Sequence, residues 1–268
     1  MTPIALTIAG SDSGGGAGIQ ADLKTFSALG VYGASALTAV TAQNTHGVTM
    51  VEDLSPAMVT AQIDAVLSDL AVGAIKIGMV SRAETALAIA AALARHGRRA
   101  VLDPVMVATS GDRLLRPEAV DALRSELLPL ADLVTPNLPE AAILADDAIA
   151  ADETAMARQA ERILALGAKA VLMKGGHGSG ETSTDLLFDG RGVHRFEAPR
   201  LATTHDHGTG CTLSAAIAAG LAKGLALEDA VGAAKRYLHA ALAAADALQV
   251  GSGRGPVHHF YPWWEADR

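Results

Sequence analysis

A short run of small residues, His207-Gly208-Thr209-Gly210-Cys211-Thr212, stands directly before an Ala-rich stretch from Leu213 to Leu225 that has the composition of a helix. The first amides of a helix have no partner within it, and the helix dipole adds partial positive charge there, so such a start binds anions. The glycines allow close approach of the backbone. We therefore predict that Gly208, Thr209, Gly210 and Cys211 hold a phosphoryl group during its transfer. The alternative is a plain glycine-rich entry into a helix, with a small buried thiol.

Cys211 is the one cysteine of the chain. A thiol at the start of a helix often has a lowered pKa, so Cys211 is a candidate either for accepting a proton or for contacting a substrate. A lone cysteine permits no internal disulfide and is typical of a reducing compartment. We expect a cytoplasmic protein.

Polar residues and glycines follow one predicted strand after another. In an open parallel α/β sheet the carboxyl ends of the strands line a common crevice, so residues far apart in the sequence meet there. The alternative is that polar residues follow strands simply because loops are exposed to solvent. We expect one site to be built from Gly10, Gln43, Met79, Asp103, Asn137 and Lys174.

Alternating strand-like and helix-like segments place these residues in an α/β fold with a mostly parallel sheet. The expected strands are Pro3–Ala9, Val31–Val40, Ala74–Ile77, Ala100–Leu102, Leu133–Val134 and Ala170–Met173, with a hairpin over Ser183–Phe188 and Val193–Phe196. The expected helices are Ile19–Leu29, Pro56–Leu70, Ser81–Arg95, Pro117–Leu127, one opening at Asn137, Glu153–Leu166, and Glu228 to about Leu248. Residues Val105 to Leu115 have the composition of a mobile flap.

The glycine loop after the first strand, residues 10–18, does not match the dinucleotide fingerprint, because its glycines are spaced as GxGxG. The chain also lacks a GxxxxGK[ST] phosphate loop. We interpret the loop as a close approach of backbone to a small substrate, with a simple tight turn as the alternative.

Composition limits the class of protein. The chain has 268 residues, of which 50% are hydrophobic and 3% aromatic, and no polar linker divides it, so we expect a single domain over residues 1–268. A net charge of −8 without a basic cluster argues against nucleic acid as a partner. The longest apolar run, Ala86 to Ala94, is too short to span a membrane.

Seven motifs in register resemble the hydroxymethylpyrimidine/phosphomethylpyrimidine kinases of thiamine biosynthesis, which belong to the ribokinase-like superfamily. In order along the chain they are AGSDSGGGAGIQADLKTF, TAQNTHGV, IKIGM, VLDPVMV, TPNLPEA, LMKGG and HGTGCTLSAAIA. The resemblance implies a three-layer fold with helices on both faces of the sheet. It also implies that MgATP binds across the later strand ends and the pyrimidine at the earlier ones.

Particular roles are implied by the same resemblance. Gln43 is similar to the family's pyrimidine-binding glutamine, and Gly208 to Cys211 resembles its anion hole. Lys235 is expected to reach the phosphate of a phosphorylated substrate. The other implied contacts are Gly10, Asp22 and Met79 in the pyrimidine pocket, Asp103 and Glu140 at magnesium, and Asn137, Lys174 and Thr209 near ATP.

One departure stands beside the anion hole. The family usually reads Asn-Thr-His-Gly-Thr-Gly-Cys, whereas this chain has His205-Asp206 at the first two positions. The added carboxylate is expected either to weaken nucleotide binding or to supply a second metal contact.

Three functions remain open at this point. The first is a kinase for hydroxymethylpyrimidine and then its monophosphate, expected to work as a homodimer. The second is a pyridoxal or pyridoxine kinase, because that ring also carries a hydroxymethyl group. The third is a pyrimidine sensor without catalysis.

Overall fold

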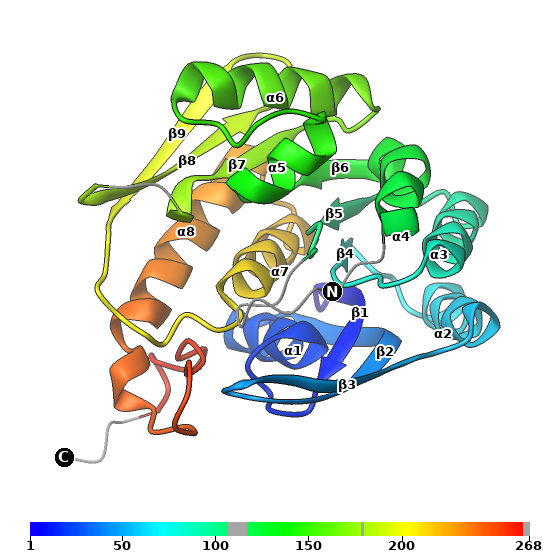
Figure 1. The fold of residues 1–268 in the computed structure, drawn as a ribbon. Helices are drawn as coiled ribbons and strands as arrows, with labels where there is room; N and C mark the ends of the chain where they lie inside the picture. The colour runs from blue at the N-terminus through cyan, green and yellow to red at the C-terminus, as the bar shows by residue number, and fades with distance from the viewer. Residues whose placement is uncertain (107–116, 178–179, 265–268) are drawn as a thin grey trace.

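The computed structural model describes residues 1–106, 117–177 and 180–264 (Figure 1). Its nine strands form a single sheet in the order β3-β2-β1-β4-β5-β6-β7-β8-β9. The strands β2, β1, β4, β5, β6 and β7, neighbours in this order, are parallel. The pairs β2–β3, β7–β8 and β8–β9 are antiparallel. The strands are β1 (Ile4–Asp12), β2 (Tyr32–Asn44), β3 (Gly47–Asp53), β4 (Ala74–Ile77), β5 (Ala100–Leu102), β6 (Ala131–Val134), β7 (Val171–Lys174), β8 (Thr182–Phe188) and β9 (Val193–Pro199).

Helices cover both faces of this sheet, which confirms the expected three-layer α/β fold (Figure 1). One face packs against α1 (Gly18–Ala28), α7 (Thr209–Ala222) and α8 (Leu227–Ala243). The other face packs against α2 (Pro56–Asp69), α3 (Ala83–Arg95), α4 (Pro117–Ala122), α5 (Leu138–Ala145) and α6 (Glu153–Ala165). Short helical turns occupy Leu123–Leu127, Leu128–Leu130, Gly175–His177 and Ala245–Ala247.

Strand periodicity explains how the two faces are filled. In β4, Ile75 and Ile77 pack in the core beneath α2 and α3, while Ala74 packs toward α7 and α8. Successive side chains of a strand point to opposite faces, so Lys76 is directed to the side of α1 and α7. The fully buried Lys76 side chain therefore lies between the sheet and helices α1 and α7.

The starts of α2 and α5 show the expected capping chemistry. The Ser55 side chain accepts a hydrogen bond from the amide of Met58, and Pro56 occupies the first helical position of α2. At α5, Asn137 and Glu140 form a reciprocal capping box. These two caps hold the loops after β2–β3 and after β6 in place.

Most expected elements are present, with three differences. Strand β2 continues to Asn44, and the antiparallel strand β3 was not predicted, because its middle is solvent-exposed and has no buried face to create a pattern. Helix α7 begins at Thr209, earlier than the Ala-rich run suggested. Of the expected flap, all but Val105 and Met106 lies outside the described residues. Across the described parts of the chain, no helix has both the length and the apolar character of a membrane span.

Candidate active site

A cleft of about 740 Å³ runs along the carboxyl ends of the strands and past the start of α7. It brings together residues of β1, β2, β7, β8 and β9, residues that directly follow β4 and β5, and residues of α5, α8 and the start of α7, as expected from the strand-end pattern. Of the predicted site residues, Asp22 alone does not line it. The lining includes Gly10, Gln43, Met79, Asp103, Asn137, Glu140, Lys174, Gly208, Thr209, Gly210, Cys211 and Lys235.

The start of α7 has the geometry that an anion site needs. Gly208 caps the helix in the left-handed region, with φ of 79°, and a side chain at this position would collide with the carbonyl oxygen of Gly16. Two residues further on, an added side chain at Gly210 would lie 3.3 Å from Lys174 Nζ. The free amides of the helix start and the lysine ammonium therefore face the same space.

Lys174 joins two carboxylates at the centre of the cleft. Its Nζ lies 3.0 Å from an oxygen of Asp103 and 4.0 Å from an oxygen of Glu140. Asp103 also accepts hydrogen bonds from the hydroxyls of Thr135 at 3.1 Å and Ser214 at 3.3 Å. Burial opposes ionisation of Asp103, but the charges of Lys174 and Lys76 and the hydrogen bond from Thr135 hold its pKa below the ordinary value.

Glu140 differs from Asp103 in its protonation. Burial raises the pKa of Glu140 to about 7, although Lys174 acts in the opposite direction. Lys174 stays charged, because the two carboxylates outweigh its burial and raise its pKa. The cluster thus combines an ionised Asp103–Lys174 pair with a glutamate whose pKa lies near neutrality.

Gln43 lies on the β2 side of the cleft, where its Oε1 accepts a hydrogen bond from Thr41 Oγ1 at 3.1 Å. His207 Nε2 lies 3.0 Å from Asp12 Oδ2 and 3.3 Å from Gln43 Nε2. Since one ring nitrogen cannot donate and accept at once, His207 donates to the Asp12 carboxylate and is only a neighbour of the Gln43 amide. This carboxylate also accepts hydrogen bonds from the amides of Gly14, Gly16 and Ala17, so it orders the glycine loop. Sequence analysis did not identify Asp12 as a residue of this site.

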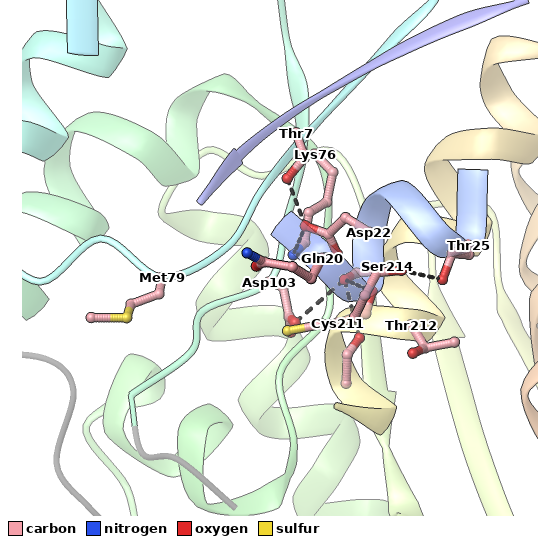
Figure 2. Close-up of polar contacts among 12 residues, drawn as sticks. Thr7, Gln20, Asp22, Thr25, Lys76, Met79, Asp103, Cys211, Thr212 and Ser214 are labelled. Atoms are coloured by element: carbon pink, nitrogen blue, oxygen red, sulfur yellow. Dashed lines mark hydrogen bonds and ion pairs between the residues drawn. The ribbon is translucent and has the colours of Figure 1, made fainter. Parts of the chain in front are cut away.

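Asp22 requires a correction, which Figure 2 makes visible. It is completely buried behind the cleft, where Lys76 Nζ contacts both carboxylate oxygens at 3.0 and 2.8 Å and Thr7 donates at 2.6 Å. Burial alone lowers the pKa of a lysine, but Asp22 reverses this effect and raises the pKa of Lys76, so the ion pair persists. The sequence signal for this buried ion pair was Lys76, a lysine within the otherwise apolar strand Ala74–Ile77.

Lys235 lines the cleft from α8. Its Nζ donates to Asp185 at 2.7 Å and to Ser183 at 3.1 Å, both on β8. Its expected contact with the phosphate of a phosphorylated substrate stays a prediction.

Cys211 occupies the expected place, but its predicted acidity is wrong. It lies in the first turn of α7 and lines the cleft. Burial raises the pKa of its thiol to about 11, and this outweighs the favourable effects of Lys76 and of the Gly18 backbone. Sequence reasoning considered the helix start alone and left out the desolvation caused by packing.

Comparisons with known proteins agree with this geometry. The family model for phosphomethylpyrimidine kinase matches residues 12–258. The hydroxymethylpyrimidine/phosphomethylpyrimidine kinase of Rhizobium meliloti is 70% identical over 265 residues, which is 99% of this chain and 100% of that protein. A crystal structure of phosphomethylpyrimidine kinase from Clostridium difficile is 47% identical, with a TM-score of 0.79 over 89% of this chain and 98% of that one. An ADP complex of Bacillus subtilis pyridoxal kinase is 38% identical, with a TM-score of 0.89 over 97% of this chain and 98% of that one. The chain therefore belongs to the phosphomethylpyrimidine kinase family.

Proposed function

We propose that this chain transfers the γ-phosphoryl group of ATP to hydroxymethylpyrimidine, and then transfers a second one to the resulting monophosphate. The observation that carries the proposal is that Gln43 near the end of β2, Lys174 at the end of β7 and the start of α7 line one cleft. An acceptor bound near Gln43 and a nucleotide bound near Lys174 meet at the free amides of Gly208 to Cys211. The activities of the relatives support the choice of acceptor.

The transfer itself needs alignment and charge neutralisation. Phosphoryl transfer passes through a loose transition state, so the protein mainly holds donor and acceptor in line and stabilises charge on the equatorial oxygens. The α7 amides and the ammonium of Lys174 supply this stabilisation. Because Lys174 is already held by Asp103, it needs no reorganisation when the phosphate arrives.

Gln43 recognises the pyrimidine in this proposal. A ring nitrogen and the exocyclic amine of the pyrimidine form an acceptor and donor pair, which one side-chain amide matches with two hydrogen bonds. Gly10 and Met79 also line this end of the cleft and are proposed to contact the ring. Thr41 donates a hydrogen bond to Gln43 Oε1 and so orients the side chain before the substrate binds.

Asp103 and Glu140 are the residues proposed to hold magnesium. Carboxylate oxygens fit this ion, which usually takes one or two of them together with waters and substrate phosphates. Within the described residues there is no group of three or more acidic, histidine or cysteine side chains that forms a complete protein cage. Two carboxylates beside a nucleotide site are therefore the donor set expected for Mg²⁺ that arrives with ATP. When bound, the ion neutralises charge on the ATP phosphates.

The variant Glu140→Gln tests the magnesium assignment. Glutamine keeps the capping box at the start of α5, so the helix should remain intact while the charge is lost. We expect weaker binding of MgATP in calorimetry and slower turnover, with pyrimidine binding unchanged. An equal loss of pyrimidine affinity would remove Glu140 from the metal site.

A substrate panel tests the function as a whole. With MgATP, mass spectrometry should detect phosphorylation of hydroxymethylpyrimidine and its monophosphate in preference to pyridoxal. Pyridoxal is the second candidate acceptor, because the match to a pyridoxal kinase covers 97% of this chain. Preferred phosphorylation of pyridoxal would favour that activity. Pyrimidine binding without ADP formation would instead indicate a sensor.

We also propose that two copies associate through the β2–β3 edge of the sheet. β3 is the terminal strand of the order, and the side chains of Val40, Met50 and Val51 are exposed there. Exposed edge strands pair readily with a second chain. Sedimentation should show a dimer that Met50→Lys weakens, and a monomer at all concentrations would exclude this arrangement.

A further inference from the structure

The glycine loop, residues 12–17 between β1 and α1, contacts the part of the chain that carries Gln43. The Ser13 hydroxyl donates to the backbone carbonyl of Gln43 at 2.9 Å and accepts from the backbone amide of Gln43 at 2.9 Å. A side chain at Gly14 would lie only 3.1 Å from the same carbonyl oxygen, so the two backbones pack closely there. The loop therefore supports the backbone from which the Gln43 side chain extends.

The same loop contacts the start of α7 on its other side. A side chain at Gly16 would collide with the ring of His207, and a side chain at Gly208 would collide with the carbonyl oxygen of Gly16. These glycines let the loop and the residues before α7 meet at close range. Helices α1 and α7, which follow the two segments in the chain, lie side by side (Figure 1).

The Asp12 carboxylate ties these contacts together. It is 3% exposed and accepts hydrogen bonds from the amides of Gly14, Gly16 and Ala17 at 2.8, 3.0 and 2.8 Å. It also accepts a hydrogen bond from His207 Nε2 at 3.0 Å. Burial opposes its ionisation, but the hydrogen bonds from His207, Ala17 and Gly14 hold its pKa below the ordinary value. A charge-assisted hydrogen bond therefore joins the residue before the α7 start to the glycine loop.

We propose that His207 is a positioning residue for phosphoryl transfer, which acts through Asp12 and the glycine loop to hold the α7 amides in register with Gln43. The inference rests on the proposed kinase function. In that function the pyrimidine alcohol binds through its ring at Gln43 but reacts at its hydroxymethyl oxygen, which must reach the phosphoryl group at the α7 amides. A misplacement of about 1 Å between reacting groups can lower a rate by about 10²-fold. Each ligand alone still finds its own contacts, so His207 should affect turnover and not affinity.

The backbone beside His207 has further anchors, which should allow its variants to fold. The amide of His207 donates to the carbonyl oxygen of Gly255 at 3.1 Å. The neighbouring Asp206 accepts two hydrogen bonds from the guanidinium of Arg254. Loss of the His207 side chain should therefore loosen the α7 start relative to the glycine loop without detaching it from residues 254–256.

The variants His207→Leu and His207→Gln test the role of the ring N–H. Leucine removes the donor, whereas the glutamine side-chain amide can again donate to Asp12. We expect His207→Leu to lower kcat for the alcohol about ten- to a hundred-fold, with Kd for hydroxymethylpyrimidine and for MgATP, measured by calorimetry, within about two-fold of the native values. His207→Gln should recover most of kcat.

The variant Ser13→Ala cuts the opposite end of the same link at an exposed residue. It should also lower kcat for the alcohol. In the double variant with His207→Leu, the loss should be smaller than the product of the two single losses, because the link is already broken. Losses that simply multiply would show two independent effects and would contradict a link through the loop.

His259 provides a matched control for folding. It is 4% exposed against 8% for His207, and its Nε2 lies 3.0 Å from Thr212 Oγ1 on α7. His259→Leu should lower the free energy of unfolding without changing kcat. An unchanged kcat in His207→Leu, an equal loss of kcat in His259→Leu, or Kd values that rise as much as kcat falls would overturn the proposal. Turnover of the alcohol by the native chain in the same assay reports separately on the kinase function itself.

Discussion

The thiol of Cys211 provides a direct test of how the acceptor loses its proton. With a pKa of about 11, the thiol holds a thiolate fraction of roughly 0.03% at pH 7.5, against roughly 10% for a free cysteine. A base present in so small a fraction contributes little to catalysis. We therefore expect Cys211 to orient the acceptor as a neutral thiol, which a loose transition state allows, because the alcohol keeps its proton until late.

Alkylation measures this pKa without interference, since the chain contains one cysteine. Iodoacetamide modification followed by intact mass from pH 7 to 11.5 should give a midpoint near 11 for the folded protein. The same protein in urea is the internal control, with a midpoint of about 8.5. The pH midpoint is the readout, because restricted access slows the rate at every pH without moving the midpoint.

The same shift predicts a pH-dependent stability. Between about pH 8.5 and 11 the folded thiol keeps a proton that the unfolded thiol has lost, so the free energy of unfolding falls as pH rises through this window. The full difference is about 3 kcal/mol, and Cys211→Ser should flatten the alkaline side of the curve relative to the native chain.

Two results would refute this reasoning about Cys211. One is an alkylation midpoint at or below that of the urea-unfolded control. The other is a loss of ~10²-fold or more in kcat for Cys211→Ser on the alcohol step alone, which is the scale of general-base catalysis. Either result would support the interpretation that Cys211 acts as a thiolate base.

Three further substitutions test the remaining assignments. Gln43→Ala should weaken binding of the pyrimidine alcohol by about 1–3 kcal/mol, measured as a higher KM. A higher KM for ATP alone would place Gln43 outside the acceptor pocket. Lys76→Met leaves the buried Asp22 carboxylate without its ion-pair partner. It should lower the free energy of unfolding by about 3–5 kcal/mol in urea titrations. Adding Asp22→Leu should recover much of that stability, and failure to do so would mean that the pair acts through more than its charge. Lys235→Met tests the expected contact with the acceptor phosphate and should raise KM for the monophosphate more than KM for the alcohol. Equal KM values for the native chain and the variant would leave Lys235 only as a structural partner of Asp185.

Much of the site could be predicted from the sequence, because the topology of a parallel sheet does the assembly. Once Gly10, Gln43, Asp103 and Lys174 are recognised as strand ends, the rule that these ends share one edge places them in a common cleft. The glycines around Thr209 likewise identified a helix start by local rules alone. Such predictions need only the order of elements and the few residues beside each motif.

Side-chain partners and burial were decided by the tertiary structure. Lys76 and Asp22 are 54 residues apart, and Arg254 and Asp206 are 48 apart, so no local pattern pairs them. The pKa of Cys211 depends on how tightly neighbouring elements exclude water, an effect opposite in sign to that of the helix start. The sequence by itself determined which residues reach the active edge of the sheet. Packing decided which of them face the cleft, which are hidden behind it, and which charges remain free, because these depend on desolvation and on contacts between distant parts of the chain.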